Sequence, residues 1–179
     1  FIVTALLQLS VPSKMIYDSV ITEKEGTTFK LRTTPIDPND YLRGKYIILD
    51  YAVSSYATTD TTFKNEEQIF IVLKKDQQGF AKIASVLHEE PEGEKDYVIA
   101  EVSHSYGGKV YFELPFNRFY MNENKAPKAE EAYNEYSRVE KARPAYALVA
   151  VKEGNGVVKD VIIDGMPVKE YVLKQMQIE

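Results

Sequence analysis

Eight short runs rich in β-branched, aromatic and other apolar residues follow one another along this chain and limit its fold to a few classes. The runs cover residues 29–34, 45–53, 68–74, 80–87, 96–102, 109–114, 146–152 and 157–163. Turn sequences such as DQQG, EPEG, YGG and EGNG separate several of them. Short extended runs between such turns predict strands joined by tight connections. We therefore expect a β-dominated fold with antiparallel or mixed sheets.

The run at residues 45–53 is the strongest strand signal. Seven of the eight residues from position 46 to position 53 are apolar or aromatic, and Asp50 is the exception. Such continuity predicts a central strand that is covered on both faces. The loop before it is rich in Pro and Asp, and Gly44 at its end indicates a backbone position that a side chain would obstruct.

One amphipathic helix is expected near residues 127–143, which makes the fold class α+β. Its apolar positions recur at helical spacing and are Ala129, Ala132, Tyr133, Tyr136 and Val139. Two segments, IFIVLKKDQQGFAK at 69–82 and YALVAVKEGNGVVK at 146–159, resemble each other as hairpins with a glycine in the turn. The similarity predicts two alike β lobes, about 25–105 and 106–179, within a single globular domain at 17–179; chance similarity between hairpins is the alternative.

The first thirteen residues carry no charge and begin with FIVTALLQL. A membrane-spanning helix needs about 20 apolar residues, and the apolar core of a signal peptide about 7–15. We expect an N-terminal apolar helix in which residues 1–16 form the C-terminal part of a membrane anchor or a signal segment. An ordinary buried helix is the alternative, and packing against a neighbouring chain would give a homo-oligomer.

Composition and the absence of motifs exclude several classes of function. The formal net charge is −5 and the isoelectric point is near 5.2, so no basic field is available for nucleic acid. The chain has no cysteine, which excludes disulfides, thiolate catalysis and cysteine-bound zinc. His88 and His104 are the only histidines, and HEE at His88 is expected to form an exposed turn. Neither a nucleophile elbow nor a phosphate loop occurs. We expect no metal, no cofactor and no assignable catalytic residue.

Two stretches resemble the conserved blocks of the bacterial GDYxxLxY family. The first, PIDPNDYLRGKYIILDY, matches at Pro35, Asp37, Pro38, Arg43, Gly44, Tyr46, Leu49 and Tyr51. The second, NRFYMNENKAPKAEEA, matches at Arg118, Tyr120 and Glu130. The chain departs from the family at Lys45, where Asp is usual, and at Asn117, where Glu is usual. The resemblance covers most of residues 20–168 and implies a membrane-anchored domain of unknown function beside a multi-span membrane protein.

Arg43 and Arg118 are the strongest candidates for functional residues, because each lies in a loop flanked by aromatic residues. Their guanidinium groups can lock the loops by pairing with nearby carboxylates, or they can receive an anionic ligand. The candidate binding or motif positions are Asp37, Pro38, Arg43, Gly44, Tyr46, Tyr51, Arg118, Tyr120 and Glu130. Tyr46 and Tyr51, with Tyr97 and Tyr111, are expected as core or cross-strand residues, and a recognition surface is the alternative.

Two hypotheses about function follow from these observations. The first is a membrane-anchored, non-enzymatic interaction or accessory domain, with its soluble part outside the cytoplasm and an adjacent multi-span membrane protein as partner. The second is a hydrolase or a small anionic-ligand-binding domain that uses the Arg43 and Arg118 loops. Convergence of both arginines with an unpaired carboxylate in a pocket would favour the second hypothesis.

Overall fold

The computed structural model describes residues 2–34, 46–120 and 145–176. The helices are α1 (Ile2–Glu25) and α3 (Val168–Met176). The strands are β1 (Thr27–Thr34), β2 (Tyr46–Ile48), β3 (Asp50–Tyr51), β4 (Ser55–Ala57), β5 (Gln68–Lys75), β6 (Ala81–Leu87), β7 (Tyr97–Tyr106), β8 (Lys109–Glu113), β9 (Arg118–Tyr120), β10 (Tyr146–Lys152), β11 (Asn155–Ile163) and β12 (Met166–Pro167). The helix predicted at 127–143 lies outside the described residues.

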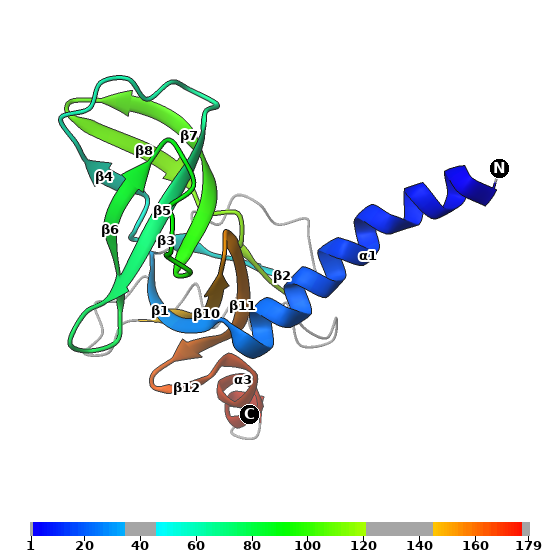
Figure 1. The fold of residues 1–179 in the computed structure, drawn as a ribbon. Coiled ribbons are helices and arrows are strands. Elements are labelled where there is room, and N and C mark those ends of the chain that lie inside the picture. Colours follow the sequence, from blue (N-terminus) through cyan, green and yellow to red (C-terminus); the bar gives the residue numbers. More distant parts are fainter. Residues whose placement is uncertain (1, 35–45, 121–144, 177–179) are drawn as a thin grey trace.

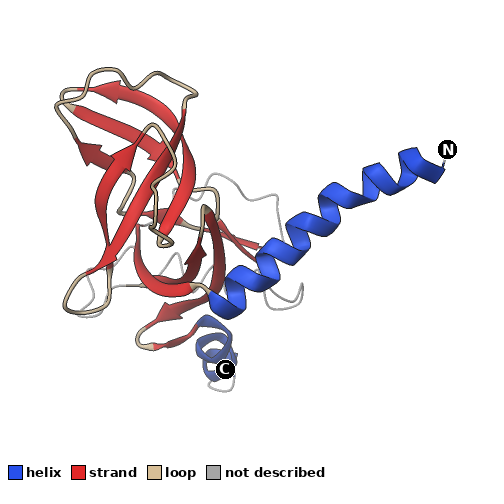
Figure 2. Cartoon of the chain, in the orientation of Figure 1, coloured by secondary structure: helices blue, strands red, loops and turns tan. Residues whose placement is uncertain are grey.

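The strands form two five-stranded sheets and one two-stranded ribbon (Figures 1 and 2). One sheet has the order β12-β11-β10-β1-β3, the other has the order β4-β8-β7-β5-β6, and β2 pairs with β9. All pairings between these strands are antiparallel. The prediction of a β-dominated fold with antiparallel sheets is therefore confirmed.

A large hydrophobic core joins the two five-stranded sheets, and a smaller cluster of Phe70, Val72 and Tyr97 lies apart from it. Phe29 and Leu31 of β1 lie in the same buried cluster as Ile71 of β5 and Val98 of β7. Two isolated parallel bridges, Lys30 with Phe80 and Val98 with Gly154, also connect the sheets. Burial of these apolar side chains away from water is the main favourable contribution to the free energy of folding.

The two sheets do not follow the expected halves of the chain. The expected boundary between lobes at residues 105 and 106 falls within β7, which pairs with β8 in one hairpin. Strand β1 from the N-terminal part pairs along most of its length with β10 from the C-terminal part. Long-range pairing, rather than sequence proximity, therefore divides the strands between the sheets.

The predicted strand at 45–53 is divided, and the expectation of burial on both faces is wrong for residues 49–52. Leu49 and Tyr51 are buried, whereas Asp50 and Ala52 are exposed. The chain changes partner at Leu49: β2 before it pairs with β9, and β3 after it pairs with β1 at the edge of a sheet. An edge strand needs an apolar side chain only at alternate positions, and in β3 and its neighbours these positions are Leu49 and Tyr51.

Four elements have no counterpart among the sequence predictions: β4, β9, β12 and α3. Strand β4 lies in a polar segment, and β9 lies in a stretch that was expected to be a loop. Helix α3 has only 9 residues, with Glu170 in its first turn and Lys174 in its last. Elements this short contain too few residues for a periodic pattern to appear.

Helix α1 runs outward from the sheets, and its N-terminal half projects away from them (Figure 1). Its C-terminal end contacts β10 and β11, where the Thr22 side chain is 2% exposed. Lys152 Nζ lies 2.5 Å from Glu25 Oε2, and Lys159 Nζ donates to the Glu23 carbonyl at 3.2 Å. The alternative of an ordinary buried helix is wrong for residues 8–19 of α1, because their side chains are mostly exposed. Among the described residues, no helix has both the length and the apolarity that crossing a membrane requires.

Candidate functional site

The structure brings the two motif blocks together. Tyr46 of β2 is in register with Tyr120 of β9, Ile47 with Phe119, and Ile48 with Arg118. Tyr46 and Tyr120 thus lie on paired strands, as the cross-strand prediction expected of Tyr46. Asp37, Pro38, Arg43, Gly44 and Glu130 lie outside the described residues. Convergence of the Arg43 and Arg118 loops therefore stays a prediction.

Tyr51 contacts the residue that directly precedes the second block. Its ring is buried, and its hydroxyl donates to the Phe116 carbonyl at 2.9 Å. The Tyr51 and Phe116 rings meet edge to face with their centroids 5.7 Å apart. The Leu49 N–H donates to the Asn117 carbonyl at 2.8 Å. These contacts make Tyr51 a core residue that fixes the backbone leading into β9, as one of the two readings of the tyrosines predicted.

Phe116 fits between this tyrosine and a glycine of β11. It is 6% exposed, and a Cβ added at Gly156 would overlap its ring. A residue with a side chain at position 156 would therefore displace the ring. We call Leu49, Tyr51, Phe116, Asn117 and Gly156 the motif clamp.

The remaining tyrosines of the prediction are also structural. Tyr97 is 3% exposed, packs near Phe70 and donates its hydroxyl proton to a Glu90 carboxylate oxygen. Burial, together with that carboxylate, raises the pKa of Tyr97 to about 12. Tyr111 pairs with His104 across β7 and β8, and their rings stack at 4.4 Å.

A hollow of about 540 Å³ lies beside the motif clamp. Its polar lining consists of Gln68, Glu101, Ser103, Glu113 and Asn117. Glu101 is in register with both Gln68 and Glu113, so two carboxylates face each other across neighbouring strands. Like charges in this relation destabilise a sheet unless something neutralises them. The lining suits a cationic or amide group, and it has the wrong charge for the anionic ligand of the second hypothesis.

A second hollow, of about 410 Å³, is acidic as well. Four glutamates contribute to its lining: Glu90, Glu92, Glu94 and Glu153. Lys95 is the one basic residue of that lining. Neither of these two hollows among the described residues offers the guanidinium groups that an anionic ligand needs.

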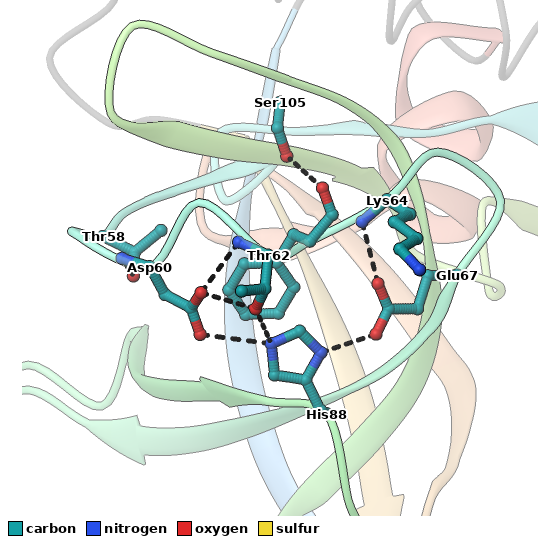
Figure 3. Close-up of polar contacts among 8 residues, drawn as sticks. Thr58, Asp60, Thr62, Lys64, Glu67, His88 and Ser105 are labelled. Atoms are coloured by element: carbon teal, nitrogen blue, oxygen red, sulfur yellow. Dashed lines mark hydrogen bonds and ion pairs between the residues drawn. The ribbon is translucent and has the colours of Figure 1, made fainter.

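A cluster around His88 is the most organised polar site in the described part of the chain (Figure 3). The imidazole Nδ1 lies 2.5 Å from Glu67 Oε1, and Nε2 lies 3.2 Å from Asp60 Oδ2. Nε2 also lies 3.1 Å from Thr62 Oγ1. The Phe63 ring stacks on the imidazole, with centroids 4.1 Å apart and planes 12° apart.

Each carboxylate of the His88 cluster is also held by the loop that carries it. The Lys64 N–H donates to Glu67 Oε2 at 2.8 Å. Asp60 Oδ1 accepts from the Thr62 N–H at 2.8 Å and from the Thr62 hydroxyl at 2.6 Å. Hydrogen bonds to the charged forms lower the pKa of Asp60, chiefly those from Thr62, and lower the pKa of Glu67, chiefly that from Lys64.

Thr62, His88 and Glu67 have the order of a nucleophile, a base and an orienting acid. The proton arrangement opposes that chemistry, because the Thr62 hydroxyl donates to Asp60 and a ring N–H faces the Thr62 oxygen when His88 is charged. A base that already carries its proton cannot accept one from Thr62. Among residues 2–34, 46–120 and 145–176, no group of three or more His, Asp or Glu side chains is arranged to hold a metal ion.

Comparison with known protein families gives one match. The family model described as GDYXXLXY protein matches residues 8–161. The chain belongs to the GDYXXLXY protein family. No curated protein and no solved structure matches significantly. The family match begins within α1 and ends within β11, so the motif clamp and the His88 cluster both lie inside the GDYXXLXY region.

The clamp explains part of the GDYXXLXY motif in physical terms. Leu49 and Tyr51 are the last two motif positions. Leu49 bonds to the backbone of Asn117, the first residue of the second block, and Tyr51 bonds to the backbone of Phe116, the residue before it. Asn117 departs from the residue usual in the family, but it takes part in the clamp through its carbonyl oxygen, which every residue has. The departure therefore leaves this hydrogen bond intact.

Sequence reasoning missed the His88 cluster in this GDYXXLXY protein. His88 was expected in an exposed turn because HEE follows a predicted strand. Its partners Asp60 and Glu67 lie 28 and 21 residues earlier in a polar segment. Phe63, a single aromatic residue in that segment, is the one signal that the segment folds back onto the sheet.

Proposed function

We propose that this GDYXXLXY protein is a membrane-anchored, non-enzymatic interaction or accessory domain. Helix α1 holds it at a bilayer, its soluble part lies outside the cytoplasm, and its partner is an adjacent multi-span membrane protein. The proposal rests on one observation, the group of exposed apolar side chains around α1. Leu9, Val11, Met15, Ile16 and Tyr17 are each more than 60% exposed.

The distribution of these side chains favours lipid over a single protein groove. At 100° per residue, Leu9 and Ile16 lie on one side of the helix, and Val11 and Met15 lie on nearly the opposite side. A helix that packs into one groove of a protein needs only one apolar face. The first charged residue of α1 is Lys14, so the helix is uncharged over the half that projects from the sheets.

The motif clamp supports a non-enzymatic role. Leu49 and Tyr51 make internal contacts that position β9, and their hydrogen bonds go to backbone carbonyls. A residue whose polar group is bonded inside the fold serves structure rather than chemistry. The partner and the extracytoplasmic side are supported by the family resemblance and need direct tests.

Vesicle flotation tests the anchor. The chain 1–179 is mixed with phosphatidylcholine vesicles and separated on a density gradient. We expect the unaltered chain to float with the vesicles and the variant Leu9→Glu/Ile16→Glu to remain at the bottom, because each substitution places a charge on the exposed apolar helix.

The control variant is Ile99→Glu, which changes an apolar residue of β7 that is 36% exposed. We expect it to float like the unaltered chain. Failure of the unaltered chain to float, or equal flotation of the α1 variant, would overturn the anchor.

A further inference from the structure

The loop at residues 58–67 is tied to the body of the protein at both ends. The Thr58 N–H donates to the Gly108 carbonyl at 2.9 Å, at the tip of the β7–β8 hairpin. The Glu66 N–H donates to the Val102 carbonyl at 2.8 Å, and the Val102 N–H donates to the Glu67 carbonyl at 2.9 Å. Between these ties, His88 bonds the loop through its ring and carries the Phe63 ring on its face (Figure 3).

The hydrogen bonds of this cluster indicate the charge of the His88 ring. Both ring nitrogens of His88 face carboxylate oxygens, at Glu67 and at Asp60, and an ionised carboxylate only accepts hydrogen bonds. A neutral imidazole has one N–H, whereas the imidazolium has two. All the bonds of the cluster are therefore satisfied when His88 is charged.

Loss of that proton affects the two ends of the loop differently. The shorter contact, to Glu67, keeps its N–H when the neutral ring is protonated at Nδ1. Nε2 then has a lone pair that faces Asp60 Oδ2 across 3.2 Å. Two acceptors at that distance repel each other. The Thr62 hydroxyl, 3.1 Å from Nε2, can donate to the neutral ring only by giving up its hydrogen bond to Asp60. The contact between His88 and Asp60 is therefore the one that opens.

We propose that His88 is a proton-operated latch on loop 58–67, closed when the imidazole is charged and released at its Asp60 end when the imidazole is neutral. Opening separates Asp60 from the His88 ring and uncovers the Phe63 ring, which is 6% exposed in the closed state. The loop is also bonded to Val102, which lines the acidic hollow beside the motif clamp, so the latch and that hollow share a backbone segment.

The direction of each pKa shift agrees with the geometry. The hydrogen bond to Glu67 is the largest cause that raises the pKa of His88, Asp60 adds to it, and burial opposes both. The ordinary pKa values are 6.5 for His88, 4.5 for Glu67 and 3.8 for Asp60. The charged groups around the ring are Asp60 and Glu67, with the Lys64 ammonium acting on Glu67.

The sign of the pH dependence follows from these directions. Because the pKa of His88 is raised in the folded state, its contribution is complete below pH 6.5 and is lost as the pH rises through the raised pKa. Because the pKa values of Asp60 and Glu67 are lowered, their contribution is complete above pH 4.5 and is lost as the pH falls through the lowered values. The latch is therefore tightest between pH 4.5 and pH 6.5.

Amide hydrogen exchange, resolved by NMR and corrected for intrinsic rates, tests the latch in the chain 1–179. We expect the protection of the Thr62 N–H, which is bonded to Asp60, to fall about tenfold between pH 6 and pH 8.5, the factor expected for one charge-assisted hydrogen bond. The Lys64 N–H, which is bonded to Glu67 at the end that stays closed, should change much less. The variant His88→Gln should show low protection at both pH values. Protection that does not change between pH 6 and pH 8.5 in the unaltered chain would overturn the proposal.

Two further variants keep the test independent of a folding defect in His88→Gln. Asp60→Asn should lower the pKa of the His88 ring in an NMR titration and remove most of the pH dependence, with the amide exchange of β5 unchanged. The control His104→Gln alters the other histidine, which stacks on Tyr111, and should keep the full pH dependence. Unchanged behaviour of Asp60→Asn, or loss of the pH dependence in His104→Gln, would refute the latch.

Discussion

At the scale of single residues, the family motif has a mechanical role. The Tyr51 hydroxyl donates to the Phe116 carbonyl, and the two rings meet edge to face. Gly156 has no side chain, which leaves the space that the Phe116 ring occupies. A tyrosine supplies both contacts because it combines an apolar ring with a polar tip. The clamp should therefore be sensitive to changes of a single atom or a single methyl group.

Removal of the Tyr51 hydroxyl tests the polar half of the clamp. In Tyr51→Phe the buried Phe116 carbonyl loses its donor, and we expect the free energy of unfolding to fall by about 1–2 kcal/mol in urea denaturation. Tyr106→Phe is the matched control, because Tyr106 is 81% exposed. Equal stability of the two variants would show that the Tyr51 hydroxyl contributes nothing.

A methyl group at Gly156 tests the apolar half. Gly156→Ala places a Cβ against the Phe116 ring, and we expect a loss of about 1–3 kcal/mol of stability. In a Phe116→Leu background the same substitution should cost less, with a coupling of about 0.5 kcal/mol or more in a double-mutant cycle. Strict additivity of the two substitutions would contradict the contact.

At the scale of elements, two features depend on how strands and helices meet. The end of α1 approaches β10 so closely that position 26 has no room for a side chain. On the other sheet, paired strands β7 and β8 place Glu101 opposite Glu113. The close approach at Gly26 is a packing constraint, and the Glu101–Glu113 pair is an electrostatic cost.

The joint between α1 and β10 should loosen in Gly26→Ala. An added Cβ would overlap the Thr22 carbonyl oxygen and lie 2.9 Å from the Val151 carbonyl oxygen. We expect the local opening free energy of the last turn of α1 to fall by roughly 1–3 kcal/mol in native-state hydrogen exchange. Gln8→Ala, in the exposed part of α1, is the control and should leave that turn unchanged.

Removal of one charge from the Glu101–Glu113 pair should stabilise the sheet that contains β7 and β8. We expect Glu113→Gln to raise the free energy of unfolding by roughly 0.2–1 kcal/mol at low ionic strength, because it removes a like-charge neighbour. Added salt should reduce the gain, since it screens exposed charges. The double variant Glu101→Gln/Glu113→Gln should gain little beyond either single variant; fully additive gains would show that the two charges do not interact.

At the scale of the whole molecule, one core joins the sheets. Phe29 in the first sheet and Ile71 in the second are both less than 2% exposed and belong to one cluster. Parallel bridges at Lys30 and Val98 add backbone connections between the sheets. A continuous core of this kind unfolds cooperatively.

Single-transition unfolding is therefore expected. Phe29→Ala should cost about 3–5 kcal/mol and Ile71→Ala about 2–5 kcal/mol. In both variants, far-ultraviolet circular dichroism and tyrosine fluorescence should report one coincident transition in urea. If urea unfolding showed two transitions, and each variant shifted the midpoint of only one of them, the sheets would be independent units.

The candidate site was only partly accessible from the sequence. Tyr51 was singled out because its position matched a motif, and its structural role follows from Phe116, 65 residues later. His88 was expected in an exposed turn, and neither of its carboxylate partners is near it in the sequence. Residues that act together in a β-rich fold come from different strands, and local patterns do not record which strands meet.

The sequence by itself determined where the longer strands lie, because alternation of side chains and turn chemistry are local properties of a few residues. Only the tertiary structure decided which strands are neighbours, that the run at 45–53 divides between two partners, and that the polar segment before β5 closes on His88. Those choices depend on how apolar faces from distant parts of the chain share one core, and that packing is a property of the whole molecule.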